Sequence, residues 1–192
     1  MKKLFLITTC ILALALNCNK SNAQTAFQKG DLGLNFGLGL GDNDGYYYGN
    51  YHSGNIFVPT FNFALDYGIL GNIINSHGSI SAGGYFGIGR GSNDEGGYKD
   101  IDNRWRLGTR GMLHYTWVNN LDTYAGLCVG YCYEKLKRKD KNSGNQWDSI
   151  DDSRFDIFPI AGVRLMFGSF GIYSELTWQD FAYFQIGITF IL

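Results

Sequence analysis

The sequence predicts an all-β fold: a transmembrane antiparallel up-and-down β-barrel of eight strands, preceded by a cleaved signal peptide. Three observations lead to this prediction. Long stretches alternate between apolar and polar residues, as a strand does when one face meets lipid and the other a polar interior. The composition is rich in glycine (27 residues) and aromatics (16%) and low in charge (17%). Beyond the N-terminus, no apolar run reaches the roughly 20 residues that a membrane-spanning helix needs.

The N-terminus has the features of an export signal. A basic start precedes an almost purely apolar run over residues 4–16, which is too short to span a bilayer as a helix. Small residues at Ser21 and Ala23 fit a signal-peptidase site, so we expect residues 1–23 to be removed. An alternative is lipid attachment at Cys18, although the residues before it fit a lipid-attachment motif poorly.

The mature chain, residues 24–192, is expected to form a single barrel domain. Its strands are predicted over residues 31–40, 57–67, 79–90, 104–118, 123–135, 154–167, 170–178 and 181–192. In the first, four leucines and Phe36 alternate with three glycines and Asn35. In the second, aromatic residues alternate with smaller or polar ones that include Asp66, and the third alternates in the same way. Each segment suits a membrane strand of about ten residues.

The fourth segment indicates which face meets lipid. Arg106, Arg110 and His114 share one face, whereas Leu107 and Trp117 lie on the other. An arginine facing lipid at mid-bilayer costs about 2 to 4 kcal/mol, so the arginine face is expected to point into the barrel.

The next segments continue this pattern with one irregularity. The fifth places Leu127 outward and Cys128 and Glu134 inward. The sixth contains Pro159, which lacks the backbone donor of a sheet ladder and therefore predicts a β-bulge. Beyond that bulge, the inside and outside assignment of residues 160–167 stays open. The seventh and eighth segments complete an even number of strands, as single-chain bacterial barrels require.

The eighth segment carries one continuous apolar stripe to the end of the chain. We call this the C-terminal stripe: Phe184, Ile186, Ile188, Phe190 and Leu192. A barrel's closing strand needs such a lipid-facing stripe.

The connections differ strongly in length. Residues 41–56, 91–103 and 136–153 are long polar stretches, whereas residues 119–122 and 168–169 are tight turns. Bacterial barrels alternate long external loops with short periplasmic turns. We therefore expect periplasmic termini and extracellular long loops in the outer membrane of a Gram-negative bacterium.

The alternating strands and the C-terminal stripe resemble small eight-stranded outer-membrane proteins of the OmpA-like type, within the broad group of outer-membrane β-barrel or porin-family proteins. In that family the last strand usually ends in an aromatic residue, where this chain has Leu192. The resemblance implies recognition by the outer-membrane assembly machinery and periplasmic chaperones. We expect no peptidoglycan-binding domain after the barrel.

Charged side chains are predicted to gather in the interior. These residues are Asp66, Arg106, Arg110, His114, Glu134, Asp156, Arg164 and Glu175. The interior of an eight-stranded barrel is just wide enough for side chains, and buried charges persist when they are paired. We therefore expect a salt-bridged plug. A narrow or gated pore, and a catalytic or proton-conducting cluster, are the alternatives.

No cofactor, metal site or enzymatic activity is expected. Cys128 and Cys132 would lie about 13 Å apart on one strand, too far for a disulfide. His52, His77 and His114 show no ligand spacing. Some eight-stranded barrels that modify lipid A place a histidine near the C-terminus, but no histidine follows His114 here.

Two loop clusters have open interpretations. The third long loop carries a basic block made of Lys135, Lys137, Arg138, Lys139 and Lys141. It is either a solvated loop or a surface that grips lipopolysaccharide phosphates. The first long loop carries Tyr46, Tyr47, Tyr48 and Tyr51, which form either an aromatic girdle or an adhesive surface.

The sequence therefore favours a monomeric outer-membrane barrel with a structural or surface-interaction role and a plugged interior. Its partners would be outer-membrane lipids and lipopolysaccharide. Porin-like or lateral transport of small solutes or hydrophobic molecules is the alternative, and a soluble periplasmic barrel around an apolar ligand is a third. A net charge of -1 argues against a nucleic-acid partner.

Overall fold

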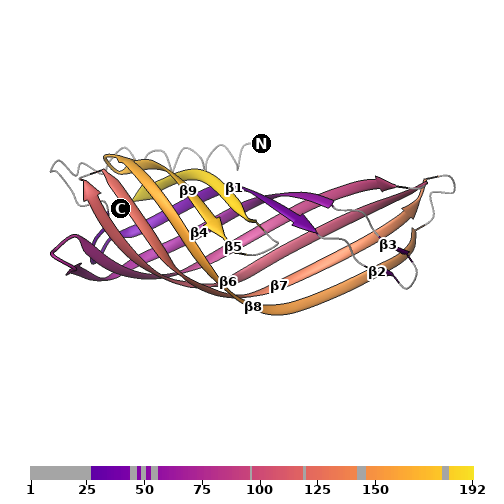
Figure 1. Ribbon diagram of the computed structural model, residues 1–192, viewed down its shortest axis with the longest axis horizontal. Coiled ribbons are helices and arrows are strands. Elements are labelled where there is room, and N and C mark those ends of the chain that lie inside the picture. Colours follow the sequence, from indigo (N-terminus) through magenta and orange to yellow (C-terminus); the bar gives the residue numbers. More distant parts are fainter. Residues whose placement is uncertain are drawn as a thin grey trace, which may run out of the picture.

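Eight antiparallel strands close into one barrel (Figure 1). The computed structural model describes residues 27–43, 47–48, 51–52, 56–95, 97–118, 120–141, 146–178 and 182–192. The barrel strands are β1 (Leu32–Asn43), β4 (Ile56–Ile73), β5 (Gly78–Glu95), β6 (Tyr98–Val118), β7 (Leu121–Asp140), β8 (Gln146–Phe167), β9 (Phe170–Thr177) and β10 (Phe184–Ile191). Two short strands, β2 (Tyr47–Tyr48) and β3 (Tyr51–His52), pair separately. Within these residues no helix is long and apolar enough to cross a membrane.

The strand order confirms the predicted up-and-down barrel. Each barrel strand pairs with its neighbours in the sequence, and β1 closes the ring by pairing with β10. The last rung of that closure joins Leu32 and Leu192 through two backbone hydrogen bonds of 3.1 and 3.0 Å. The predicted signal peptide and its cleavage site lie outside the described residues.

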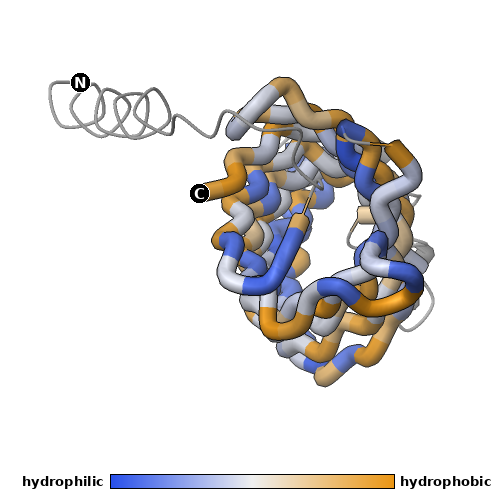
Figure 2. Tube along the Cα trace, turned by 90° about the vertical axis from the view of Figure 1, so that its left-hand side faces the viewer, coloured by the Kyte–Doolittle hydropathy of each residue, from blue (hydrophilic) through white to orange (hydrophobic). Residues whose placement is uncertain are grey.

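Apolar side chains cover the outside of the barrel, and the interior holds the charged and polar side chains together with some apolar ones. On β6, Leu107 is 57% exposed, whereas its neighbour Arg106 is fully buried. The same alternation runs along the other strands, and Figure 2 shows it as hydrophobic and hydrophilic residues alternating around the ring. The predicted faces of the first five segments agree with the observed burial.

Four strands extend well beyond the closed ring. The ladder between β4 and β5 begins at Thr60 and Gly89, and the ladder between β8 and β9 begins at Ile160 and Thr177. Beyond these rungs, β5 to β8 pair only with one another among the described strands. We call this part the protruding sheet: residues 90–95, 98–103, 135–140 and 146–151. Figure 1 shows it at the right, beyond the ends of β9 and β10.

The protruding sheet corrects the prediction of two long loops. Residues 91–103 and 136–153 were expected to be loops, yet most of them are strand. The sequence pattern misled because the apolar stripe ends near Trp105, while backbone pairing continues to Tyr98 and Asp140. A sheet that extends beyond the apolar outer wall needs no apolar face. Its strands therefore lack the alternation of apolar and polar residues by which a strand is recognised in a sequence.

Pro159 causes no bulge, so that prediction was wrong. β8 keeps its register with β7 through the pair of Leu127 and Pro159. The Pro159 carbonyl points the other way, toward β9, and accepts a hydrogen bond from the Trp178 backbone N–H at 3.3 Å. Because the paired residues of β9 end at Thr177, the missing proline donor affects only the end of that ladder. Residues beyond Pro159 keep their faces, and Arg164 remains inward and fully buried.

A short N-terminal segment closes one end of the barrel. Phe27 is only 2% exposed and packs with Met166 and Ile191. Its carbonyl accepts a hydrogen bond from the Ser79 hydroxyl at 2.8 Å. The segment passes so close to Gly68 that a Cβ there would lie 1.9 Å from the Gln28 carbonyl oxygen. The segment therefore packs into this end of the barrel, a contact that no sequence pattern predicted.

The protruding sheet leaves one edge of β8 open. Residues 146–158 pair with β7, but no described strand pairs with their other side. The Ser153 backbone N–H instead donates to the carboxylate of its neighbour Asp152 at 2.8 Å. In antiparallel strands, alternate residues bond to opposite sides, so odd residues here point to the open edge and even residues to β7.

This alternation predicts that proline at two adjacent positions lowers the free energy of unfolding by very different amounts. Ser153→Pro removes an N–H that faces the open edge and should change the free energy of unfolding by less than about 1 kcal/mol. Asp152→Pro removes a hydrogen bond of the ladder with β7, leaves its acceptor unsatisfied and should cost about 1 to 3 kcal/mol. Urea unfolding of the two purified variants measures the difference. Equal losses would mean that another segment pairs with this edge.

Candidate functional site

The interior charges form the candidate site. All eight residues of the predicted network point inward: seven are buried, and Asp156 is half-buried. They come from five strands, so their pairing depends on the register of the whole barrel.

Arg110 holds the centre of the network. Its Nε lies 2.6 Å from Asp66 Oδ1, a second hydrogen bond joins the same two side chains, and its Nη1 lies 3.2 Å from Glu175 Oε1. Asp66 also accepts a hydrogen bond of 2.9 Å from Asn35. The Tyr124 hydroxyl donates to Glu175 at 2.8 Å. One guanidinium thus compensates two buried carboxylates, whose remaining acceptor sites are used by polar neighbours.

A second cluster lies toward the end that Phe27 closes. His114 Nδ1 lies 2.9 Å from Asp122 Oδ2, and Arg164 Nη1 lies 3.5 Å from the same oxygen. Arg164 also donates to Asn35 at 3.3 Å, which links this cluster to the central one. Asp122 is completely buried, although the sequence placed it in a turn. β7 begins one residue earlier, at Leu121, and the strand alternation then turns Asp122 inward.

Ser81 gives this cluster the hydrogen-bond order of a hydrolase triad. Its Oγ lies 2.9 Å from His114 Nε2, and Asp122 contacts the opposite ring nitrogen. Ser81 and His114 are each only 1% exposed. The Phe27 ring stacks on His114 with centroids 4.6 Å apart, and the Arg164 guanidinium lies 5.4 Å from that ring. A nucleophile needs room for a substrate atom about 3 Å away, and packed side chains surround this serine instead.

The third cluster lies toward the protruding sheet. Arg106 Nη2 contacts Asp156 at 2.8 Å, and Arg154 reaches both Asp156 at 3.2 Å and Glu134 at 3.3 Å. Arg104 adds a contact of 3.7 Å to Glu134. Sequence reasoning missed Arg104 and Arg154 as members of the network. Their even positions continue the inward parity of their strands, and that parity was the available signal.

Inside the protruding sheet, one pair corrects the interpretation of the basic block. Arg138 turns inward and makes two hydrogen bonds of 2.7 Å to the Asp100 carboxylate. Lys135, Lys137 and Lys139 lie on the outward face of the same strand. The block is therefore a strand segment whose basic side chains alternate between an inward and an outward face.

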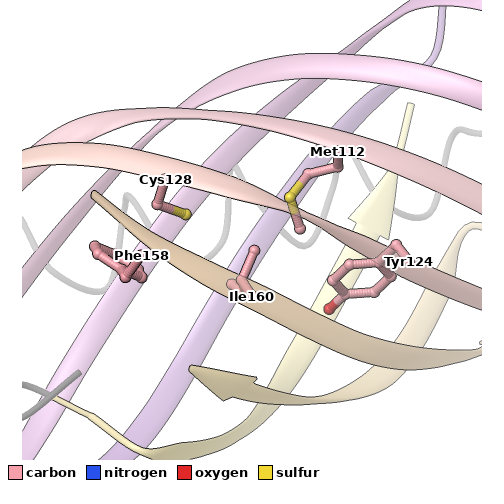
Figure 3. Close-up of a cluster of buried hydrophobic side chains, with 5 residues drawn as sticks. All are labelled: Met112, Tyr124, Cys128, Phe158 and Ile160. Carbon is pink, nitrogen blue, oxygen red and sulfur yellow. The ribbon is translucent and has the colours of Figure 1, made fainter. Parts of the chain in front are cut away.

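Apolar side chains fill the space between the charged clusters. Figure 3 shows Met112, Tyr124, Cys128, Phe158 and Ile160 gathered inside the barrel. Cys128 and Cys132 are both buried free thiols. The Arg106 guanidinium lies 5.0 Å from the centre of the Phe158 ring. A cavity of about 30 Å³ remains beside Arg110 and Glu175, which is room for about one water molecule.

The described residues contain no group of three His, Cys, Asp or Glu side chains that could hold a metal ion. His77 lies in the turn before β5, and its ring centroid is 6.1 Å from that of Tyr115. His114 serves the interior cluster. The side chains of His52 and of Tyr47, Tyr48 and Tyr51 are not among those described, and Tyr46 lies outside the described residues.

The comparisons with known proteins concern the fold. No protein-family model matches the chain, and no curated protein matches it in sequence. The crystal structure of Ail, the attachment invasion locus protein of Yersinia pestis, superposes with a TM-score of 0.51. It has 14% sequence identity and covers 85% of this chain and 96% of that one. The chain has the fold of Ail.

A second Ail structure, in complex with the heparin analogue sucrose octasulfate, gives a TM-score of 0.47 at the same identity and coverage. At 14% identity the likeness concerns the fold alone. Membership in the OmpA-like or porin families remains an expectation from the sequence.

The central pairing predicts that loss of Arg110 is costly. Arg110→Ala strands Asp66 and Glu175 as buried carboxylates, and breaking a buried pair typically costs about 3 to 5 kcal/mol. Lys141→Ala, which removes an exposed pair with Asp94, should cost less than about 1 kcal/mol. Urea unfolding of the refolded barrel measures both. The triple variant Arg110→Met, Asp66→Asn, Glu175→Gln should recover part of the loss, and failure to recover would assign the cost to packing.

Proposed function

We propose that this protein is an outer-membrane β-barrel with a surface-interaction role, whose charged interior serves as a structural plug. The observation that carries the proposal is a tightly filled barrel that extends into an open-edged sheet. The contact surface would be the protruding sheet, and the barrel would anchor it in the membrane. We infer no enzymatic role, because Ser81 and His114 of the triad-like arrangement are each only 1% exposed and Phe27 stacks on His114.

The outer wall supports the membrane placement. Large apolar side chains such as Phe61, Leu127 and Ile157 are 64%, 58% and 73% exposed. Soluble monomers rarely expose contiguous apolar surface of this extent, whereas a barrel wall in lipid requires it. This wall also argues against a soluble periplasmic barrel with an apolar interior.

Two aromatic groups support a membrane boundary at each end of that wall. Trp105 packs beside Tyr131 and Tyr133, and Tyr115 packs beside Trp117. Trp105 and Tyr115 lie on the same strand, about 34 Å apart at roughly 3.4 Å per residue. At a tilt of about 45°, this separation crosses about 24 Å, close to the roughly 25 Å apolar band of outer-membrane barrels.

The connections support an orientation with the protruding sheet outside the cell. Residue 27, the C-terminus and the turn at Gly168 lie at one end of the barrel, and the protruding sheet leaves the other. Known barrels keep short turns in the periplasm. The C-terminal stripe faces outward on β10, where the assembly machinery could bind it before the ring closes.

The open edge of β8 supports the surface role. A strand edge without a partner strand among the described residues offers a template for a strand of another protein. The half-exposed side chains of Asp151 and Asp152 lie on this strand. Like charges at an edge discourage pairing with a second copy of the same edge. A basic, extended segment of an external protein is the kind of partner that fits, and the protein itself would remain a monomer.

The membrane placement predicts that an arginine is tolerated according to depth. Leu107→Arg and Asn103→Arg change the same face of β6, but only Leu107 lies within the apolar band. Leu107→Arg should lower folding stability in phosphatidylcholine vesicles by about 2 to 4 kcal/mol, and Asn103→Arg should have little effect. Heat-dependent gel mobility after refolding measures the folded fraction. Equal yields for the two variants would reject the membrane placement.

The plug predicts that the wild-type barrel conducts no steady current. In planar lipid bilayers, purified protein should give no stable channels, because paired side chains leave no continuous water path. Arg110→Ala removes the central side chain and should produce small, transient openings. Steady channels in the wild type, with Arg110→Ala changing only their ion selectivity, would favour the porin-like alternative.

A further inference from the structure

The outward face of the protruding sheet carries an unusual basic groove. Arg90, Lys135, Lys137 and Lys139 line a groove of about 530 Å³ on the outside of β5, β6 and β7. Arg90 and Lys135 lie on one rung, joined through Asn103, and the two other lysines follow at alternate positions of β7. Regular strand geometry thus holds four positive side chains on one surface, which a flexible loop would not do.

Little negative charge compensates this groove. Asp151 contacts Lys135 at 2.9 Å, and this hydrogen-bonded carboxylate raises the pKa of the Lys135 ammonium. Among the described side chains, Arg90, Lys137 and Lys139 have no ion-pair partner. Their inward neighbour Arg138 is paired with Asp100. The inner face of the sheet is therefore neutralised, and the outer face keeps an excess of positive charge.

The groove lies at the proposed membrane boundary. Trp105 and Tyr133 form its lower wall, and both belong to the aromatic group that marks the edge of the apolar band. A basic side chain here can reach the headgroup region of the outer leaflet, with its aliphatic stem along the strand.

An apolar groove continues from the basic one. It has a volume of about 680 Å³ on the lipid-facing side of β1, β4, β5 and β10, with Leu38, Phe61 and Phe86 among its lining residues. Ile88 lines both grooves, so they meet on β5. Gly37 and Gly187, which pair between β1 and β10, also line this groove with their backbones.

We propose that the two grooves together bind one class of ligand, a membrane lipid whose headgroup carries phosphate. The acyl chain lies in the apolar groove, and the phosphates contact Arg90, Lys137 and Lys139. Four basic groups against one carboxylate favour a headgroup with more than one negative charge, such as the bisphosphorylated disaccharide of lipid A. This inference rests on the proposed outer-membrane placement and adds to it a specific lipid contact.

The test compares two charge-matched variants in the full chain. Each protein is refolded into phosphatidylcholine nanodiscs, and binding of added lipid A is followed by native mass spectrometry. Lys137→Gln with Lys139→Gln removes two groove charges, and Lys29→Gln with Lys141→Gln removes two charges that do not line the groove. Each basic side chain at an anionic surface is worth a factor of about five, so the groove variant should bind about 25-fold more weakly. The control variant should bind like the wild type.

Three outcomes would overturn the lipid site. Equal weakening in both variants would mean unspecific attraction by surface charge. Equal affinity for phosphatidylglycerol would reject the preference for a headgroup of higher charge. Competition by the deacylated, water-soluble headgroup at the same concentration as lipid A would mean a phosphate site without an acyl-chain groove, whereas we expect it to bind at least tenfold more weakly.

Refolding into nanodiscs separates this inference from the proposed function. If the wild type does not insert, the membrane placement fails. If it inserts and shows heat-dependent gel mobility but binds no lipid A, only the lipid site fails.

Discussion

Closure of the ring between β1 and β10 is the constraint on which the rest of the structure depends. It removes every sheet edge within the apolar band, where an unpaired backbone group would cost several kcal/mol. In the closed ring, each strand side chain points either into the barrel or away from it. The rung between Leu32 and Leu192 completes this closure with residues near both ends of the barrel domain.

The narrow interior of the barrel requires its charged side chains to be paired. Eight strands leave space for side chains and little water, so each charge must find its counter-charge among the other strands. Arg110 does this with Asp66 and Glu175, which come from three different strands in total. Arg164 and Asn35 connect this centre to the cluster around Asp122. Such a network favours one register, because a slip of a single residue would turn its charges toward lipid.

The sequence predicted the parts of the fold that an apolar outer wall imposes. Strand alternation placed Arg106 and Arg110 inside and Leu107 outside, because a lipid-facing arginine is too costly. The partners of these arginines could not be predicted, since a contact such as Arg106 with Asp156 depends on the registers of two ladders. Phe27 was missed for a related reason: its place is set by packing against His114, which no local pattern encodes.

The prediction of loops at residues 91–103 and 136–153 failed because these residues lie beyond the apolar outer wall. The strands beyond Trp105 need no apolar face, so their sequence resembles that of a loop although their backbones pair. What replaces the apolar alternation is an alternation of charge. Arg138 pairs inside with Asp100, while Lys137 and Lys139 on either side of it face outward.

This charge alternation has a physical consequence. A solvated loop would let its basic residues turn toward the nearest carboxylates, and the block would neutralise itself. A strand separates them by its pleat, so inward pairing of Arg138 cannot satisfy the outward lysines. The same backbone ladder that extends the protruding sheet therefore maintains a positive surface next to the aromatic boundary. A surface-contact role and a contact with a phosphate-bearing lipid would use different parts of the protruding sheet. The first would use the backbone edge of β8, and the second the outward-facing side chains.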